Sequence, residues 1–231
     1  MSQMTKFLLI FFCCLLSNTI FSNDPLEEFN KITFSFNKEL DKNIAVPVAK
    51  GYQAITPNFV EVRISNAIFN IEDISIGLNN FLQGKVLESF SDLTRFFINS
   101  TLGLGGLFDL ATPLGLQKHD EDFGQTLAVW GVPNGPYIVL PVLGPSTLRD
   151  AGALIVDGFM SPSIIMDHER TIYSLQFLDL IDTRSRYLGL ESLTIGDEYL
   201  FFKDAYYQTR QYEINDGVVE DEFDDFFEEL E

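Results

Sequence analysis

Two histidines, His119 and His168, are the side chains best suited to acid–base or metal chemistry. A hydrolytic triad joins a nucleophile, a histidine base and an orienting acid. The sequence lacks the G-x-S-x-G pattern that presents a nucleophilic serine in many hydrolases. His119, Asp120, Glu121 and Asp122 are all able to bind a metal, but consecutive side chains point in different directions, and no second cluster has ligand spacing. We therefore expect a non-enzymatic protein without catalytic residue, cofactor or metal.

The polar residues of this region have a simpler use. Asp122 followed by Gln125 resembles a helix capping box, with aspartate in place of serine or threonine. Gly103, Gly105 and Gly106 lack the Lys-Ser or Lys-Thr sequence that follows the glycines of a phosphate-binding loop. We expect a helix start at Asp122 and a tight turn or close helix packing at the glycines.

The overall charge excludes one class of partner. The chain has a formal net charge of -19, and ten acidic residues without a basic one lie between Glu213 and Glu231. Nucleic acids and anionic lipid surfaces are bound through clustered Lys and Arg, so we expect no nucleic-acid partner. The 22 phenylalanines supply ample apolar material for a core and for contact with lipid.

The N-terminus has the pattern of an export signal. An uncharged apolar run from Phe7 to Leu16 follows a weakly basic start; it is too short to cross a bilayer but fits a signal-peptide core. Cys13 and Cys14 lie inside it, and either is a candidate lipid anchor. The residues before them are unusual for lipoprotein processing, so cleavage after Ser22 is slightly preferred. We assign 1–22 to the signal peptide, 23–215 to a helical domain and 216–231 to an acidic, disordered tail.

Apolar residues recur every three or four positions over most of the chain, which predicts amphipathic helices. Asp24-Pro25 is a candidate helix start, Pro47 and Pro57 are expected to separate helices, and Ser146 is expected to cap a helix. The apolar stripes predict core packing. The expected helices are 24–40, 60–82, 86–97, 147–156, 172–188 and 196–212.

The segment from Phe123 to Leu148 carries no charged residue and is interrupted by glycines and prolines. It is apolar enough for a membrane but too interrupted for a spanning helix. Two interpretations remain open: a buried loop of a soluble protein, or backbone that lines a cavity at membrane depth.

Several motifs in order resemble those of the MlaA (VacJ) family of outer-membrane lipoproteins. The resemblance covers about residues 24 to 212, and the motifs are Asp24-Pro25-Leu26-Glu27, Phe29-Asn30, Phe34-Ser35-Phe36-Asn37, Leu82-Gln83-Gly84-Lys85, 95–109, 119–127, Gly135-Pro136-Tyr137 and Leu140-Pro141.

The resemblance implies an all-α, ring-like arrangement of amphipathic helices, with the Gly/Pro-rich segment lining a channel. Family members are expected at the periplasmic, inner-leaflet side of the outer membrane. There they pass misplaced phospholipids to a periplasmic lipid carrier of the Mla system and associate with trimeric porins. The poor lipidation signal and the acidic tail depart from the family pattern.

The resemblance also assigns residues. The channel hairpin corresponds to Trp130, Gly131, Pro133, Gly135 and Tyr137. The segment that holds the channel closed corresponds to the opening helix with Phe34, Phe36 and Asn37, so disrupting Phe36-Asn37 is expected to make lipid passage unregulated. Two alternatives are a porin-associated structural protein without lipid transport and a phospholipase-like enzyme that uses His119 or His168.

Overall fold

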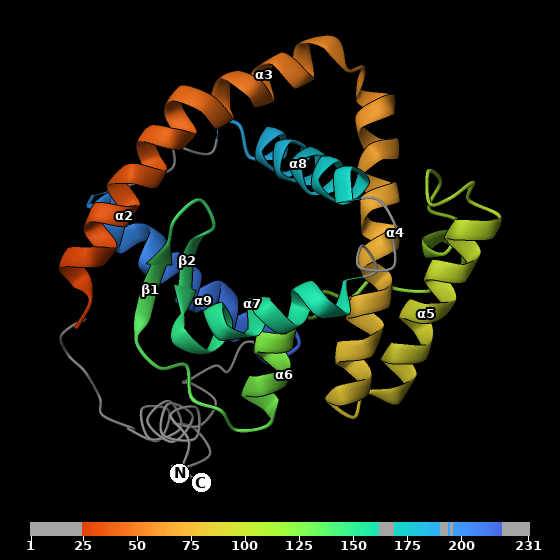
Figure 1. The fold of residues 1–231 in the computed structure, drawn as a ribbon. Helices are drawn as coiled ribbons and strands as arrows, with labels where there is room; N and C mark the ends of the chain where they lie inside the picture. The colour runs from red at the N-terminus through yellow and green to blue at the C-terminus, as the bar shows by residue number, and fades with distance from the viewer. Residues whose placement is uncertain (1–24, 162–168, 190–193, 195, 219–231) are drawn as a thin grey trace, which may run out of the picture.

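The helices of this protein are arranged in a ring, which is visible in the computed structural model (Figure 1). The structure describes residues 25–161, 169–189, 194 and 196–218. This architecture confirms the predicted all-α, ring-like fold. The two-stranded hairpin spans 137–147, so of the residues that the resemblance assigned to a hairpin only Tyr137 lies in its strands. The elements in chain order are α2 (Glu27–Leu40), η1 (Asp41–Ala45), α3 (Val46–Ile55), α4 (Asn58–Leu82), α5 (Val86–Thr101), η2 (Thr112–Leu114), α6 (Phe123–Val129), β1 (Tyr137–Leu140), β2 (Gly144–Thr147), α7 (Leu148–Met160), α8 (Glu169–Arg186) and α9 (Glu198–Ile214).

One side of the ring is a curved arch made of α2, η1 and α3 (Figure 1). The prediction that Pro47 separates two helices is wrong, because Pro47 lies in the first turn of α3 and the helix continues through it. Proline lacks an N–H and crowds the carbonyl four residues earlier. In the π-helix η1 the N–H of Val46 bonds to the carbonyl of Asp41. This wider turn makes room for the side-chain ring of Pro47.

The opposite side of the ring is α4, with α5 packed along its outer side (Figure 1). As predicted, Pro57 precedes α4 with extended backbone, and Gly84 follows it with a φ of 85°. Gly77 lets the two helices approach closely, since a Cβ there would lie 3.2 Å from the Leu93 side chain.

The polarity of these helices is the reverse of that in a soluble bundle. The buried positions of α5 are Ser89, Asp92, Arg95 and Asn99, whereas Leu87, Phe90 and Phe97 are 82%, 73% and 64% exposed. The prediction that the apolar stripes pack in a core is therefore wrong for α5. α4 buries mainly polar residues too, and the predicted apolar stripe of α2 exposes Phe29, Ile32 and Phe36.

The predicted uncharged segment contains α6 and the hairpin. Asp122 caps α6 by accepting a hydrogen bond from the N–H of Gln125 at 2.8 Å, which confirms the predicted helix start. Ser146 is not the cap of α7. Thr147, the last residue of β2, takes that position and its side chain accepts from the N–H of Asp150, while Ser146 lies one residue earlier in the strand, opposite Ile138.

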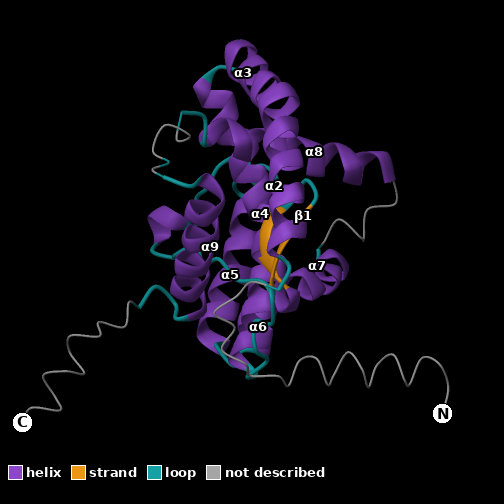
Figure 2. Cartoon of the chain, turned by 90° about the vertical axis from the view of Figure 1, so that its left-hand side faces the viewer, coloured by secondary structure: helices purple, strands orange, loops and turns teal. Residues whose placement is uncertain are grey.

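The remaining two helices confirm the predicted helical regions near 172–188 and 196–212. α8 crosses the interior of the ring, and the side view shows it reaching outward beyond the other helices (Figure 2). α9 begins at its cap Asp197 and lies beside the hairpin and α6. Asp216, the first residue assigned to the tail, forms an ion pair with Lys85. The predicted signal peptide, Cys13, Cys14, Asp24, His168 and residues 219–231 lie outside the described residues.

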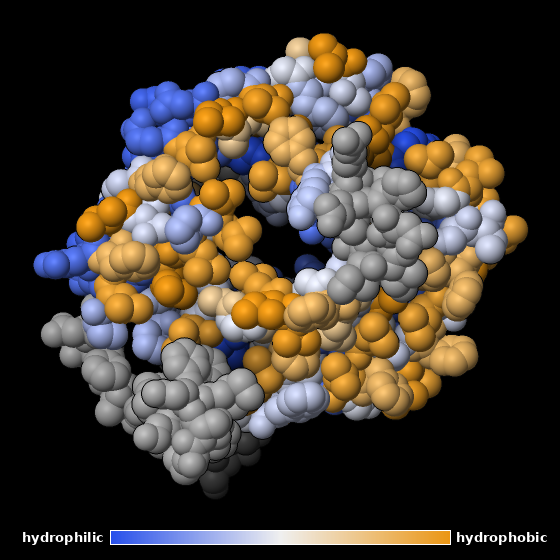
Figure 3. Space-filling model, in the orientation of Figure 1, coloured by the Kyte–Doolittle hydropathy of each residue, from blue (hydrophilic) through white to orange (hydrophobic). Residues whose placement is uncertain are grey.

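The ring encloses a central opening. In the space-filling view this opening lies between α8, α4, α7 and the β1–β2 hairpin, and hydrophobic residues cover much of the visible face (Figure 3). Among the described helices, none combines the length and the apolar character needed to cross a bilayer.

Candidate functional site

Two asparagine side chains of α2 bind the β1–β2 hairpin. The amide of Asn30 donates to the carbonyl of Tyr137 at 3.0 Å and accepts from the N–H of Val139 at 2.9 Å. The amide of Asn37 donates to the carbonyl of Leu140 and accepts from the N–H of Val142, both at 2.8 Å. Each amide thus satisfies backbone groups as a neighbouring strand would. Asn37 was predicted as a site residue, whereas Asn30 was missed.

An aromatic cluster joins the same hairpin to α2 and α9. Tyr137 is only 3% exposed, and its ring centroid lies 6.1 Å from Tyr199 and 5.7 Å from Tyr207. Phe34 packs edge-on to Tyr199 with 5.8 Å between centroids. Of the residues assigned to the opening helix, only Phe36 is largely exposed, at 53%. The structure thus brings Phe34, Asn37 and Tyr137 together around the hairpin and leaves Phe36 on the outer face.

The assigned segment 130–137 runs from the end of α6 to this cluster and contacts the end of α4. The Trp130 indole N–H donates to the carbonyl of Leu82 at 3.1 Å, and the side chain is about half exposed. Gly131 has a φ of 84° and Gly135 one of 67°, conformations that glycine adopts freely. A Cβ on Gly135 would lie 3.1 Å from the Leu148 Cβ. Pro133 lies between these two glycines and is partly buried.

The turn that joins β1 to β2 carries exposed apolar side chains. Val142 and Leu143 are 54% and 67% exposed, and the turn points into the enclosed space (Figure 1). Hydrophobic surface lies at the corresponding edge of the opening (Figure 3). The hairpin therefore presents an apolar tip to the central opening.

The buried polar side of α5 organises the loop that follows it. Arg95 donates to the Thr112 hydroxyl at 3.0 Å and to the Leu116 carbonyl at 2.6 Å. Asn99 accepts from the N–H groups of Leu110 and Ala111. These contacts assign structural roles to two polar residues of the long motif 95–109.

The glycines of that motif also have structural roles, as expected. Gly106 has a φ of 88° and its backbone lies against Asn70, so that a Cβ would approach the Asn70 Cβ to 2.6 Å. Gly105 has a φ of 72° but faces open space. The cluster forms a tight turn against α4.

His119 is used in the same polar layer. Its Nδ1 lies 2.7 Å from Oδ1 of Asp92, and Oδ2 of Asp92 accepts from the side chain of Asn80 at 2.8 Å. Burial raises the pKa of Asp92, while these two partners oppose that shift. Within the part of the chain that the structure describes, no group of His, Cys, Asp and Glu side chains has a geometry able to hold a metal ion.

A buried ionic network joins α6, α7 and α9. Arg210 forms ion pairs with Asp122 at 2.6 Å and with Asp150 at 3.0 Å, and the Tyr206 hydroxyl donates to Asp150 at 2.6 Å. Burial alone would raise the pKa of Asp150, but hydrogen bonds from Arg149, Arg210 and Tyr206 outweigh it and lower the pKa. The network therefore holds α6, α7 and α9 together next to the hairpin.

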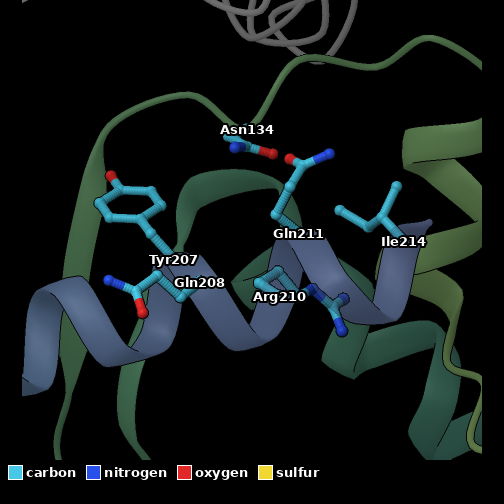
Figure 4. A pocket seen from close by; sticks show the side chains of 6 residues that line it. All are labelled: Asn134, Tyr207, Gln208, Arg210, Gln211 and Ile214. Atoms are coloured by element: carbon cyan, nitrogen blue, oxygen red, sulfur yellow. The ribbon is translucent and has the colours of Figure 1, made fainter. Parts of the chain in front are cut away.

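A pocket of about 300 Å³ lies over α9. Figure 4 shows Asn134 and Gln211 facing one another across it, while Arg210 points away toward its carboxylate partners. The pocket therefore offers amide groups rather than a free cation. The remaining lining residues are Tyr207, Gln208 and Ile214.

α8 is held inside the ring by a buried carboxylate. Asp182 is 1% exposed and accepts from the Tyr52 hydroxyl at 3.0 Å and the Ser65 hydroxyl at 2.7 Å. Arg184 adds a two-point contact with Asp41, at 2.6 and 3.0 Å. α8 is thereby bonded to both α3 and α4.

Charged groups of both signs meet where α8 approaches α4. The ammonium of Lys118 lies 3.3 Å from the centroid of the Phe69 ring, and the guanidinium of Arg186 lies 4.9 Å from it. Burial raises the pKa of the nearby Glu72 to about 7, and Lys118 opposes that shift. The inner side of α4 is thus polar, in contrast to the apolar outer side of the α4–α5 pair.

Comparison with known proteins supports the family resemblance. The family model described as "MlaA lipoprotein" matches residues 22–213. The "Intermembrane phospholipid transport system lipoprotein MlaA" of Escherichia coli is 34% identical over 203 residues, covering 85% of this chain and 80% of the relative. The Haemophilus influenzae protein of that name is 31% identical, covering 85% of this chain and 81% of the relative.

Other comparisons agree with these. An uncharacterized protein of Rickettsia typhi is 34% identical over 194 residues, covering 81% of this chain and 76% of that relative. A solved structure from work on "maintenance of bacterial outer membrane lipid asymmetry" superposes with a TM-score of 0.75 at 33% identity, covering 83% of this chain and 99% of the other. In sequence and in fold, the chain belongs to the MlaA lipoprotein family.

Proposed function

We propose that this protein carries phospholipids out of the outer membrane through its central opening and thereby maintains lipid asymmetry. The observation that carries the proposal is the reversed polarity of the ring, with polar groups buried and apolar side chains outside. Exposed apolar surface of this extent marks contact with a membrane or a partner. Two relatives are named for phospholipid transport, which agrees with this proposal.

The ring would be held in the membrane by its outer faces. Helices with one apolar face lie in the interface plane with that face among acyl chains. The outer residues Phe29 and Ile32 of α2 and Phe90 and Phe97 of α5 supply such faces. No spanning helix is required for this attachment. A lipid anchor at Cys13 or Cys14 would add to it, whereas cleavage after Ser22 would leave the apolar faces as the attachment.

Passage of an amphipathic molecule needs two kinds of wall. The headgroup and its water need polar groups, such as the charged residues around Phe69 at α4 and α8. The acyl chains need apolar contacts, such as the hairpin tip with Val142 and Leu143. We propose that lipid leaves the outer leaflet through this opening and is received by a periplasmic carrier. A trimeric porin is the proposed membrane partner.

The site residues that the resemblance assigned fit this proposal in two ways. The segment with Trp130, Gly131, Pro133 and Gly135 runs from the end of α6 to the hairpin, where it would shape the passage. Phe34 and Asn37 contact α9 and the hairpin, so α2 is in a position to control how the hairpin stands in the ring.

The proposal is tested by measuring intact phospholipid and lysophospholipid in the outer leaflet of cells that lack the gene and of cells in which it is restored. We expect intact phospholipid to accumulate without the protein and to be cleared on restoration. Lysophospholipid appearing only with the protein would instead indicate an enzyme.

A second candidate function is a porin-associated structural protein. The apolar outer side of α5 favours it, because such a face suits a protein partner as well as lipid. Under this alternative, loss of the gene weakens the envelope while surface phospholipid stays constant. The same measurement therefore separates the two functions.

A further inference from the structure

One face of α4 is turned toward α8 and combines an aromatic ring with a carboxylate. The Ser65 hydroxyl on this face donates to Asp182 of α8 at 2.7 Å. Phe69 and Glu72 follow Ser65 at helical intervals of four and three residues, so they lie on the same face of α4. Both α4 and α8 border the central opening (Figure 3). Side chains between the two helices are therefore placed beside the proposed lipid passage.

Two cations from different parts of the chain lie over the ring of Phe69. The ammonium of Lys118, in the loop before α6, lies 3.3 Å from the ring centroid. The guanidinium of Arg186, near the end of α8, lies 4.9 Å from the same centroid. Two positive charges held over one ring repel each other. An anion placed between them would therefore be bound favourably.

The charges nearest to this ring are not neutralised by direct pairing. Within the part of the chain that the structure describes, no carboxylate forms an ion pair with Lys118, and no donor bonds to the carboxylate of Glu72. The neighbouring Asp73 is engaged elsewhere, because it pairs with Arg95 of α5 at 3.5 Å. Arg186 lies 3.7 Å from a carboxylate of its own helix, and its side chain is 40% exposed. The site thus offers positive and negative groups that a ligand can reach.

The carboxylates of this site lack a compensating cation. Burial raises the pKa of Glu72 to about 7 and also raises the pKa of Asp179, while Lys118 opposes both shifts. A ligand ammonium beside these carboxylates would stabilise their ionised forms. The net charge of -19 also disfavours a ligand that is purely anionic.

We propose that the α4–α8 cluster binds the headgroup of a zwitterionic phospholipid that carries a primary amine. The cluster consists of Phe69, Glu72, Lys118, Asp179 and Arg186. Its biological role rests on the proposed lipid passage. The phosphodiester lies between the two cations, which offer N–H donors, and the ammonium lies against the two carboxylates. An anionic headgroup without an amine meets the cations but leaves the carboxylates uncompensated, so it binds more weakly.

The preference is measured by native mass spectrometry of the full-length purified protein in detergent. The probe is an equimolar mixture of dihexanoyl phosphatidylethanolamine and dihexanoyl phosphatidylglycerol, whose acyl chains are identical. We expect the parent protein to bind the ethanolamine lipid about fivefold more, the effect of one partly exposed charge pair. Equal binding, or a preference for the glycerol lipid, would overturn the proposal.

Two substitutions separate the two halves of the site. Glu72→Gln should lower binding of the ethanolamine lipid about fivefold and leave the glycerol lipid unchanged, because only the ammonium contact is lost. Lys118→Met should weaken both lipids to a similar degree, since both carry the phosphodiester. A merely structural role would not produce these different patterns. If Glu72→Gln keeps the preference of the parent protein, the assignment of the ammonium site is wrong.

Arg63→Met is the matched control. Arg63 also lies on α4 and its guanidinium is 4.3 Å from the centroid of the Phe108 ring. It belongs to the side of α4 that meets the loop after α5, where Asn66 donates to the carbonyl of Leu107. This variant should bind both lipids as the parent does. A loss as large as that of Lys118→Met would show that overall charge, not the α4–α8 cluster, controls binding.

Measurements in cells separate this proposal from lipid passage itself. Cells restored with Glu72→Gln should retain a larger share of ethanolamine lipid in the outer leaflet than cells restored with the parent gene. If loss of the gene leaves surface phospholipid unchanged, lipid passage fails, while the binding ratio still tests the cluster. If lipid is cleared but Glu72→Gln changes neither the binding ratio nor the surface share, the headgroup site is wrong.

Discussion

The side-chain amide of Asn30 takes the place of a neighbouring strand for Val139. It accepts from the Val139 N–H at 2.9 Å and donates to the carbonyl of Tyr137, and all three residues are buried. An isolated two-stranded hairpin is only marginally stable. Here the helix α2 supplies the hydrogen bonds that a third strand would otherwise make. The position of the hairpin in the ring is thus set by α2.

Replacing Asn30 with alanine should destabilise the protein by about 2–5 kcal/mol, because it removes two buried hydrogen bonds to the backbone of the hairpin. Urea unfolding of the purified protein in detergent measures this change. The matched variant Asn43→Ala removes an exposed asparagine of the same arch and should stay within about 0.5 kcal/mol of the parent. Equal effects of both variants would contradict the role of Asn30.

The two neighbouring glycines after α5 should respond differently to alanine. Both have positive φ, so each alanine variant carries about 1–2 kcal/mol of backbone strain. Gly106→Ala also forces its Cβ to 2.6 Å from Asn70, whereas Gly105→Ala meets open space. Thermal unfolding should therefore show a clearly larger loss for Gly106→Ala. A larger loss at Gly105 would show that this turn is packed differently.

Breaking the buried ionic network should be costly. Arg210→Met removes the cation that Asp122 shares with the buried Asp150, which keeps Arg149 as a partner. We expect it to lower the free energy of unfolding by about 3 kcal/mol, the lower end for a broken buried pair. Arg184→Met is the comparison, because Arg184 and Asp41 are 18% and 37% exposed whereas Arg210 and Asp150 are 9% exposed each, and solvent-exposed pairs contribute about 0–1 kcal/mol. The denaturant midpoints of the two variants measure this difference. A loss for Arg184→Met as large as that for Arg210→Met would contradict the stronger role of Arg210.

Glu72 should make stability depend on pH between about 4.5 and 7. Its pKa in the folded protein is raised to about 7 from 4.5, so the folded state binds more protons than the unfolded state in this window. Stability should therefore increase as the pH falls from about 7.

Glu72→Gln should remove this part of the pH dependence and should be more stable than the parent at pH 8. Asp73 and Asp157, whose pKa values burial raises to about 6, would keep their own contributions. Urea midpoints at pH 5 to 8 measure the difference, with exposed Glu28→Gln as the control. An unchanged slope in the Glu72 variant would contradict its assigned environment.

The apolar outer side of α5 should control attachment to lipid. Serine at Leu87, Phe90 and Phe97 removes exposed apolar side chains, each worth roughly 1.5–3 kcal/mol when fully buried in an apolar medium. Flotation with phospholipid vesicles should show weaker binding, while urea unfolding in detergent stays nearly unchanged. Strong loss of stability without loss of flotation would place this face inside the protein instead.

Periodicity predicted most helices, because spacing reports helical geometry whichever face is buried. It could not show which face that is. Burial was assigned by assuming that water surrounds the protein, and the exposed Phe90 beside the buried Asp92 shows that this assumption fails. Pro47 was misjudged for a different reason, since a π turn depends on the surrounding arch rather than on the proline itself.

The hairpin and its contacts were the least predictable part. β1 has only four residues and lies in a segment whose prolines and glycines hide the strand pattern. Asn30 and Asn37 did leave a signal, since they lie seven residues apart on the polar side of α2. Their partners lie more than one hundred residues away, so spacing alone could not name them.

The reversed polarity of the ring also explains why its opening persists. Apolar walls facing water would attract one another and collapse the ring, because burying them lowers the free energy. Polar walls that already satisfy one another, as Asp182 of α8 does with Tyr52 and Ser65, gain nothing further by closing. The width of the aperture is therefore fixed by hydrogen-bond geometry, and apolar substitutions on the inner wall should shrink it.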